Sequence, residues 1–420
     1  MKSLIILKSL AKQQKRDWVR NEELENYFID IDVFRRMYSS PDLITPEIEI
    51  LSKGYGDIVY RRFLEVLVTR MSKGCLIVLD PENEACSVFE TLALIFGYTV
   101  FWVVSPIPQD YITRPRKYNL PCYPLKRRME LERDVTSFLS LQLNDKRQVR
   151  TYQDVLDYWG KQMVDKQTIR LRGFGEKLLA ISDLHSNISL LPKNLDAYKG
   201  VIVLGDYIDG PETGGSRKLT DIIASGSRYG KNEIWLEGNH ELRLRRWLGI
   251  KMLQGTNRKE LSELLMRTLT PDFLEKTAHE YDDMTAQDAK EYLQALNKHL
   301  FLFAIVETPT ALFYCSHAGI KYPEQLDPKF IGNVVYGSRD INRIDREFSE
   351  RSAKHGDWSV HAHCKYVDNW ETQRWPGVLN ISPKDEFEVI FAELINNKWN
   401  VIQCQNEKLK LSAPQSTESD

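Results

Sequence analysis

Short apolar runs alternate with amphipathic stretches along most of the 420-residue chain. In the first 145 residues, four such runs predict buried strands: LIIL at 4–7, YFIDI at 27–31, CLIVLD at 75–80 and TVFWVV at 99–104. Helical patterns lie between them, for example DIVYRRFLEVLVTRM at 57–71. Because strands alternate with helices, this part of the chain is predicted to form an α/β domain with a parallel sheet.

A second series of strand-like runs begins near residue 173. The runs are KLLAIS (177–182), GVIVLGD (200–206), EIWLEG (233–238), ALFYCS (311–316), WSVHAH (358–363), GVLNIS (377–382) and FEVIFAEL (387–394). A charged helical segment at about 256–300 interrupts the series, and we interpret it as a solvated cap or lid, because its polar faces could not fill a core. The predicted organisation is therefore a domain at 1–145, a linker helix at 146–172, a second α/β domain at 173–404 and a disordered tail at 405–420.

Composition and charge exclude several classes of protein. Hydrophobic residues make up 42% of the chain, charged residues 28%, and the net charge is −2. No apolar run approaches the roughly 20 residues of a membrane span, so no membrane partner is expected. The cysteines lie at 75, 86, 122, 315, 364 and 404 without a C-x-x-C pair. This spacing predicts reduced thiols and a cytoplasmic location, and it argues against a disulfide scaffold or a cysteine zinc site.

Five strands of the second series each end in side chains that bind metals in other proteins. The sets are Asp183-Leu-His185, Asp206-Tyr-Ile-Asp209, Asn239-His240, His317 and His361-Ala-His363. In open α/β sheets, binding sites form at the carboxyl ends of the strands. Five sets of oxygen and nitrogen donors at strand ends predict a metal centre, whereas a single set could be a surface turn.

The donor types indicate which ions would bind. Carboxylate and amide oxygens mixed with imidazoles suit Mn²⁺, Fe or Zn²⁺ better than Ca²⁺ or copper. Two ions about 3.5–4 Å apart need a bridging carboxylate, and Asp206 lies in the middle of the set. Such ions lower the pKa of water toward neutrality, which permits hydrolysis of a phosphate ester. We therefore predict two divalent metal ions, with Mn²⁺ favoured and Fe, Zn²⁺ and Ni²⁺ as alternatives.

The series D-x-H, G-D-x-x-D, G-N-H-E, H and H-x-H, at about 180–385, resembles the calcineurin-like metallophosphoesterases. The resemblance implies a calcineurin-like α/β/β/α sandwich that hydrolyses phosphoric monoesters or diesters. It implies two metal sites that share one aspartate: Asp183, His185 and Asp206 for one ion, and Asp206, Asn239, His317 and a C-terminal histidine for the other. It also implies that His240 is the general acid or orients the phosphate, and that Asp209 fixes the tautomer of its ring.

Two departures from the family pattern leave questions open. Protein Ser/Thr phosphatases of this superfamily carry arginine after G-D-x-x-D, where this chain has Gly210, and Arg243 is a candidate substitute that would bind phosphate beside Asn239. The segment V-H-A-H-C-K aligns in two ways. Aligned as G-H-x-H, it makes both His361 and His363 metal ligands, and aligned as Y-G-H-T-P it leaves only His363. We favour His363 and keep His361 as a second candidate ligand.

The first domain resembles polynucleotide-kinase-type P-loop phosphotransferases. The resemblance is carried by YFIDIDVFRRMY, with Asp32 in the place of the catalytic aspartate, by CLIVLDPEN and by GYTVFWVVSPIPQDYITRPR. Lys15 lies where a P-loop lysine belongs. The loop before it has no glycine to wrap phosphate, with Ser9, Lys12 and Gln14 in its place, and Arg16 and Asp17 replace the Ser/Thr pair that holds Mg²⁺. We therefore expect a degenerate kinase-like domain that binds ATP poorly.

The order of the two domains resembles bacterial and phage polynucleotide kinase-phosphatases without their ligase module. This resemblance implies removal of a 3′-phosphate or a 2′,3′-cyclic phosphate from RNA or DNA ends, with an RNA ligase as a separate partner. Other enzyme functions remain open, namely a dinucleoside-polyphosphate hydrolase, which G-N-H-E-L favours, and a protein Ser/Thr phosphatase. A scaffold for a ligase or kinase partner is the alternative of a different class.

Overall fold

The computed structural model describes residues 2–8, 12–38, 48–81, 86–104, 147–173, 175–193, 195–226, 232–256, 258–320, 329, 341–352, 355–363 and 374–405. Contacts divide the chain into two compact units, of which one comprises Lys2–Ala93 with Tyr98–Lys161 and the other is built mainly from Gln162 onward. The predicted tail after residue 405 lies outside the described residues. Within them, no helix combines the length and the apolar character that crossing a membrane requires.

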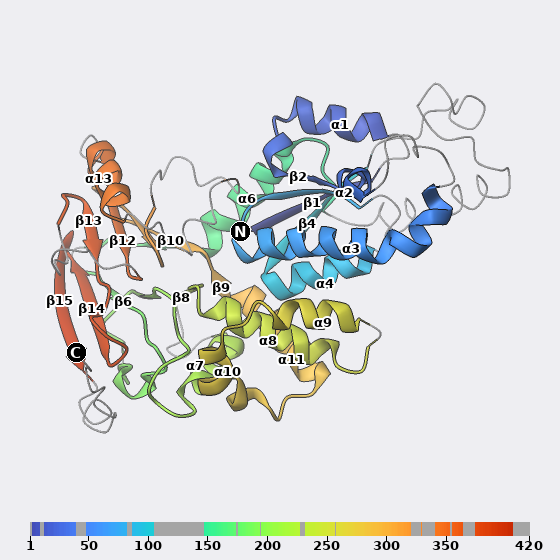
Figure 1. Cartoon of the computed structure of the whole chain (residues 1–420). Helices are drawn as coiled ribbons and strands as arrows, with labels where there is room; N and C mark the ends of the chain where they lie inside the picture. Colours follow the sequence, from blue (N-terminus) through green and yellow to red (C-terminus); the bar gives the residue numbers. More distant parts are fainter. Residues whose placement is uncertain are drawn as a thin grey trace, which may run out of the picture. The chain divides into compact units, whose positions relative to one another are not determined.

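The first unit is built on a four-stranded parallel sheet in the order β2-β3-β1-β4, of which Figure 1 labels β1, β2 and β4. The strands are β1 (Lys2–Lys8), β2 (Phe28–Asp30), β3 (Ile77–Asp80) and β4 (Tyr98–Val104). The helices are α1 (Lys12–Asn21), α2 (Ile31–Tyr38), α3 (Ile48–Ser72), α4 (Cys86–Phe96) and α6 (Tyr152–Lys166), and a 3₁₀ turn, η1, spans Glu25–Tyr27. Continuous apolar runs form strands that are buried on both faces, as parallel sheets require. All four strands predicted for this part of the chain are confirmed, and so is the parallel sheet.

The second unit contains two sheets that pack face to face. One has the order β15-β14-β6-β7-β8-β9 and the other β13-β12-β11-β10-β5. The strands are β5 (Thr168–Arg170), β6 (Lys177–Ile181), β7 (Gly200–Val203), β8 (Glu233–Leu236), β9 (Leu300–Phe301), β10 (Phe303–Glu307), β11 (Leu312–Ser316), β12 (Trp358–His361), β13 (Val378–Asn380), β14 (Glu388–Ile395) and β15 (Lys398–Gln405). Alternate residues of both sheets form one core, for example Leu178 and Ala180 from β6 with Phe313 and Cys315 from β11.

Helices cover the outer faces of this sandwich. They are α7 (Gly215–Ser225), α8 (Glu241–Leu253), α9 (Lys259–Met266), α10 (Pro271–Lys276), α11 (Ala286–His299) and α13 (Ile341–Ser352), with 3₁₀ turns η4 (Ile188–Leu190) and η5 (Ala278–Tyr281). Helix α13 packs on β12 and β13, whereas α7, α8 and α11 pack together beside the six-stranded sheet (Figure 1). The outward-facing Leu179, Val201 and Val203 are accordingly buried as well. The predicted α/β/β/α sandwich is therefore confirmed.

The charged segment at 256–300 is not a solvated cap, and that interpretation was wrong. Its helices α9, α10 and α11 bury an apolar face. The buried side chains of this face include Leu261, Leu265, Phe273, Leu293 and Leu296. Helix α11 packs against α7 and α8. Leucines at helical spacing form a narrow apolar stripe that the many charged residues between them conceal in the sequence.

The segment predicted as a linker helix at 146–172 is more than a linker. Helix α6 ends at Lys166, and β5 follows at once as an edge strand of the five-stranded sheet. Strand β5 pairs in parallel with β10, and the β-branched Ile169 contributes to the core of the sandwich. Residues 146–172 therefore supply one strand of the second unit as well as a helix.

Candidate metal centre

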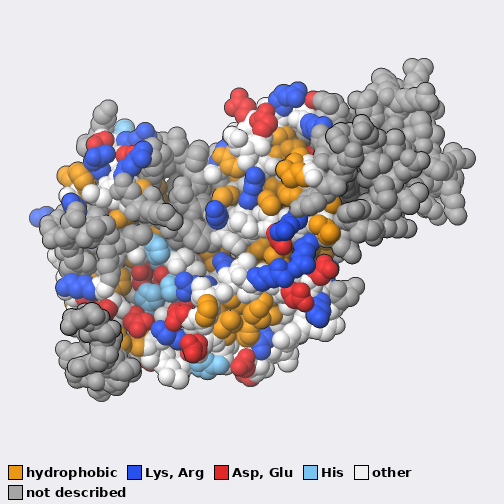
Figure 2. All heavy atoms as spheres, viewed as in Figure 1, with side chains coloured by type: hydrophobic (Ala, Val, Ile, Leu, Met, Phe, Trp, Pro, Cys, Tyr) orange, Lys and Arg blue, Asp and Glu red, His pale blue; other side chains and the backbone are white. Residues whose placement is uncertain are grey.

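The predicted donor side chains follow strands whose carboxyl ends lie at the same edge of the sandwich. Strands β6, β7 and β8 are parallel neighbours, and so are β11 and β12 in the other sheet. Because neighbouring parallel strands end at the same edge of a sheet, the residues that follow these strands lie close together. Figure 2 shows histidine and acidic side chains gathered on one face of this unit, in the region of β6 and β8.

The first group of donors consists of Asp183, His185 and Asp206. One ligand atom from each of these residues lies within 4.8 Å of the others. Asp183 Oδ1 and His185 Nδ1 are buried, and neither has a hydrogen-bond partner among the residues that the structure describes. Buried polar atoms are rarely left unpaired, and two in one cluster of donors suit a bound cation. The chemistry and the unpaired atoms of this group therefore fit a divalent metal ion.

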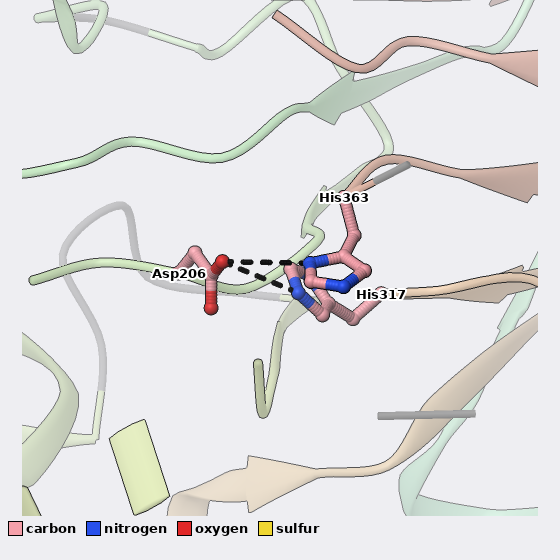
Figure 3. Close-up of side chains that lie close together, drawn as sticks. All are labelled: Asp206, His317 and His363. Carbon is pink, nitrogen blue, oxygen red and sulfur yellow. Dashed lines mark ion pairs between the residues drawn. The ribbon is translucent and has the colours of Figure 1, made fainter. Parts of the chain in front are cut away.

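The second group consists of Asp206, His317 and His363 (Figure 3). Asp206 Oδ2 lies 3.4 Å from His317 Nε2 and 3.8 Å from His363 Nδ1. Asn239 Oδ1 lies 3.1 Å from His317 Nε2, which adds an amide oxygen to the same cluster. Nδ1 of His317 donates to the carbonyl oxygen of Leu204 at 2.9 Å, so its Nε2 is the nitrogen left to bind a metal.

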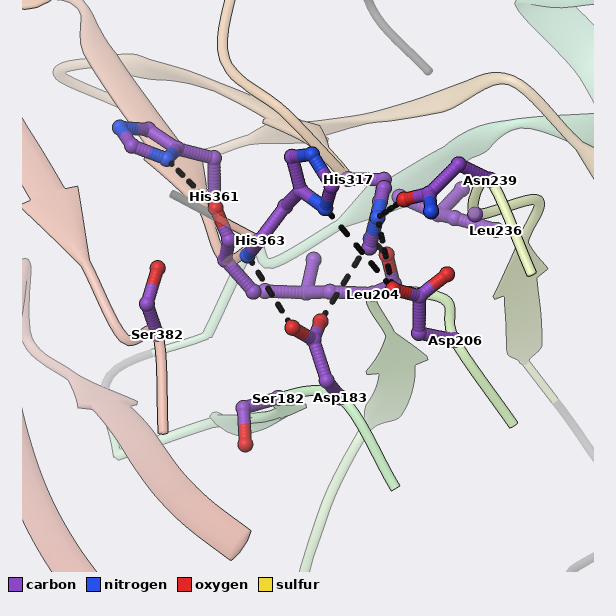
Figure 4. A network of polar contacts seen from close by, with 12 residues as sticks. Ser182, Asp183, Leu204, Asp206, Leu236, Asn239, His317, His361, His363 and Ser382 are labelled. Atoms are coloured by element: carbon purple, nitrogen blue, oxygen red, sulfur yellow. Dashed lines mark hydrogen bonds and ion pairs between the residues drawn. The ribbon is translucent and has the colours of Figure 1, made fainter. Parts of the chain in front are cut away.

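His361, the second candidate ligand at the C-terminal motif, belongs to neither group. Its buried ring points away from Asp206 (Figure 4), and its Nε2 lies 3.0 Å from Asp345 Oδ1 on α13. Residues i and i+2 of a strand share a face, but β12 ends at His361 and the chain turns through a left-handed His363 with φ of 66°. The turn directs the two histidines to different places, an arrangement that matches the alignment with a single ligand at His363.

The buried carboxylates of the two groups carry opposite pKa shifts. Burial, together with the neighbouring Asp206 carboxylate, raises the pKa of Asp183. Burial opposes ionisation of Asp206 too, but His317 and His240 outweigh it and hold the pKa of Asp206 well below its usual range. Two carboxylates packed this closely repel each other, and cations bound between them would stabilise both negative charges.

His240 and Asp209 form a hydrogen-bonded pair beside the metal groups. His240 Nδ1 lies 2.8 Å from Asp209 Oδ2, and its Nε2 lies 3.7 Å from Asp206 Oδ2. Burial lowers the pKa of His240, but Asp206 and the hydrogen bond to Asp209 prevail and raise it to about 8. This shift favours the imidazolium form of the ring, which carries a proton on Nε2, whereas cations bound nearby would lower the pKa of His240.

Arg243 is held at the edge of the same cluster. One guanidinium nitrogen donates to Asp209 Oδ2 at 3.0 Å and lies 3.3 Å from His240 Nδ1. The side chain comes from the first turn of α8, two residues after the G-N-H-E segment, and is 24% exposed. The structure thus places the candidate phosphate-binding arginine next to the histidine–aspartate pair, where it adds positive charge.

Strained backbone is concentrated in these loops. His185, Asp206, Asp209 and His363 all have φ between 39° and 66°, a left-handed conformation that residues with a side chain rarely adopt. Each such residue costs about 1–3 kcal/mol and persists only where its surroundings impose it. Four strained residues within one constellation indicate that side-chain placement is maintained there at the expense of local stability.

Gly210 is required at its position by close packing. A Cβ atom at this residue would lie 1.6 Å from the carbonyl oxygen of His185, which no side chain tolerates. The arginine that protein Ser/Thr phosphatases carry here could not be accommodated without moving the loop of a candidate metal ligand. The glycine that replaces the family's arginine at position 210 is therefore required by the packing of this loop.

Glu241 supports the loops of the candidate centre, a role that the sequence analysis did not assign to it. Its fully buried carboxylate accepts hydrogen bonds from the backbone N–H groups of Asp206, Tyr207 and Gly238, at 2.7–3.0 Å. Burial and then the Asp206 carboxylate raise the pKa of Glu241 to about 7. The glutamate joins the loop after β7 to the loop after β8. Its position in the G-N-H-E segment is the sequence feature that could have predicted a role in the centre.

Together, the sandwich fold and the two donor groups define a metal-dependent phosphoesterase. The family model described as calcineurin-like phosphoesterase matches residues 176–390, a little over half of the 420 residues. The chain belongs to that family, and it is a hydrolytic enzyme whose relatives bind divalent metal ions.

No curated protein matches the sequence. A crystal structure described as that of a "putative diadenosine tetraphosphatase" is similar at 13% identity, with a TM-score of 0.33, over 57% of this chain and 99% of the other. At this level the likeness carries no argument about substrate.

Proposed function

We propose that the chain hydrolyses phosphate esters with two divalent cations, Mn²⁺ foremost. The observation that carries the proposal is that Asp206 belongs to both donor groups, one with Asp183 and His185 and the other with His317 and His363. A carboxylate shared between two sites is what a two-cation centre needs. Asn239, 3.1 Å from His317 Nε2, would complete the second site.

The cations, when bound, lower the pKa of water and polarise the phosphoryl oxygens. The protein contributes the rest of the chemistry through His240, whose Nε2 carries the proton that the leaving oxygen requires. Asp209 accepts from Nδ1, fixes the orientation of the ring and stabilises its imidazolium form, in which Nε2 carries a proton as well. Arg243, fixed by Asp209, would bind a non-bridging phosphate oxygen together with Asn239.

For the substrate, we propose a 3′-phosphate or 2′,3′-cyclic phosphate at an RNA or DNA end. The domain order supports this, because it resembles polynucleotide kinase-phosphatases. The packing at Gly210 argues against a protein Ser/Thr phosphatase, because the characteristic arginine has no room there. Dinucleoside polyphosphates remain the competing substrate class, on the strength of G-N-H-E-L.

An end-specific assay tests this proposal. The protein with Mn²⁺ is offered RNA and DNA oligomers with 3′-phosphate or 2′,3′-cyclic ends, diadenosine polyphosphates and phosphopeptides. We expect the highest kcat/KM on one of the nucleic-acid ends. Preferred hydrolysis of a diadenosine polyphosphate or a phosphopeptide would reject the substrate proposal and leave the two-cation proposal intact. No turnover of any substrate, including p-nitrophenyl phosphate, would favour a scaffold.

For the first unit, we propose a kinase-like domain that has lost phosphotransfer. Lys15 lies in the first turn of α1, directly after β1 in the chain, as a P-loop lysine would. Its Nζ lies 2.5 Å from Asp80 Oδ1, at the end of the neighbouring β3, and the side chain is only 4% exposed. To bind a nucleotide phosphate, Lys15 would have to give up its ion pair with this buried aspartate. The unit would then serve to bind nucleic acid or an RNA ligase.

A labelled-ATP assay with 5′-hydroxyl RNA and DNA checks this prediction. We expect no transfer above background, because the predicted loop has no glycine and Lys15 is already paired with Asp80. Lys15→Ala provides the control for trace activity. Transfer by the unaltered chain that disappears in Lys15→Ala would show a working kinase and reject the proposal.

A further inference from the structure

The helical segment at 256–300 contacts the pair formed by Asp209 and His240. Thr277, between α10 and η5, is 1% exposed, and its hydroxyl donates a hydrogen bond to Asp209 Oδ1. The other oxygen of this carboxylate, Oδ2, accepts from His240 Nδ1 at 2.8 Å and from Arg243 at 3.0 Å. Every oxygen of the Asp209 carboxylate therefore has a donor, and Thr277 is the donor that comes from the inserted helices.

The same segment also fixes the chain that follows Asp209. Glu280 accepts from the backbone N–H groups of Gly214 and Arg217, at 3.1 and 2.7 Å, and so caps the N-terminus of α7. Helix α7 has no side-chain cap of its own, since its N-cap residue is Gly214. Tyr281 adds a buried hydrogen bond of 3.0 Å to Thr220. The loop from Asp209 to α7 is thus held at both ends by residues 277–281.

These contacts suggest why Asp209 needs outside support. Its backbone is left-handed, with φ of 61°, a conformation that is costly for an aspartate. A carboxylate with one free oxygen could rotate about its last side-chain bond, and the ring bound to it would follow. A second anchor on Oδ1 removes that freedom, because the carboxylate plane is then defined from both sides.

We propose that Thr277 is a positioning residue for hydrolysis: through Asp209 it holds His240 so that Nε2 meets the leaving oxygen. The inference rests on the proposed role of His240 as general acid. On this proposal, the helices of residues 256–300 take part in catalysis, whereas the sequence predicted only a cap or lid. Within the described residues, the side-chain hydrogen bond of Thr277 goes to Asp209, which belongs to neither donor group of the metal centre.

Thr277→Val tests the proposal, because valine keeps the shape of threonine and removes only the donor. Turnover is measured with Mn²⁺ on p-nitrophenyl phosphate, whose leaving group needs little protonation, and on phenyl phosphate, whose leaving group needs much more. We expect kcat on phenyl phosphate to fall about tenfold, as for loss of one hydrogen bond to a charged group, while kcat on p-nitrophenyl phosphate and both KM values change little. Thr277→Ser, which restores the hydroxyl, should recover most of the loss.

The readouts separate positioning from a general loss of structure. Equal losses on both phosphates, or a fall in bound metal or in thermal midpoint that matches the loss of activity, would overturn the proposal. So would a Thr277→Val enzyme with unchanged turnover on phenyl phosphate. His240→Ala, measured in parallel, tests the acid role of His240 on which the proposal rests. If His240→Ala keeps full activity, that acid role is wrong. If His240→Ala loses activity and Thr277→Val does not, only the role of Thr277 is wrong.

Discussion

Asp206→Ala is expected to abolish hydrolysis of every phosphate ester and to remove both cations from the protein. Asp206 contributes to each of the two donor groups, whereas every other member belongs to one. Its loss therefore removes an anionic ligand from both sites at once, and the donors that remain carry too little negative charge to hold two divalent ions. The measurement is metal content by mass spectrometry after loading with Mn²⁺, together with turnover of p-nitrophenyl phosphate.

Two further variants make this result interpretable. Asp206 Oδ1 also accepts from the backbone N–H of His240 at 3.0 Å, so alanine removes a structural contact as well. Asp206→Asn keeps an oxygen for that contact and should still lose both metals, because the charge is absent. Glu263→Ala, on the exposed side of α9, should leave metal and turnover unchanged. Turnover in excess chelator, or by either Asp206 variant, would contradict the two-cation assignment.

The sequence predicted most of the candidate centre because its residues follow strands. Apolar runs locate the strands, and parallel neighbours such as β6, β7 and β8 deliver their carboxyl ends to one edge. Strand order alone therefore predicts that Asp183, Asp206 and Asn239 lie close together. The inference needs only strand direction and order, and it does not depend on how the helices between the strands pack.

Contacts between residues distant in the chain could not be predicted in this way. His361 pairs with Asp345 on α13, a helix whose position the strand pattern does not specify. The turn after β12 places His363, and not His361, beside Asp206. Thr277 reaches Asp209 only because α10 and α11 bury apolar side chains that a highly charged segment conceals. Tertiary packing determines these cases, and a single sequence shows periodicity but not which surfaces meet.

His240→Ala is expected to lower kcat by about 10²–10⁴-fold while both cations remain bound, because general acid–base groups contribute about that much. The ring belongs to neither donor group, and its Nε2 lies 3.7 Å from the nearest oxygen of Asp206. The backbone N–H that bonds to Asp206 survives the substitution, so the bridge keeps that contact. Turnover of phenyl phosphate and p-nitrophenyl phosphate is measured beside metal content, and the loss should be larger for phenyl phosphate.

Asp209→Asn and a matched histidine variant complete the test. An asparagine side chain at this position would offer its amide to His240 without the negative charge, so the tautomer and the proton affinity of the ring both change, as they do when a histidine loses its carboxylate partner. The loss of activity in Asp209→Asn should approach that of His240→Ala, and the double variant should be little worse than either, because the two residues act as one unit. His279→Ala, at an exposed histidine of η5, should have no effect. If His240→Ala loses its metals as Asp206→Ala does, the ring is a ligand; if turnover stays near normal, the proton comes from elsewhere.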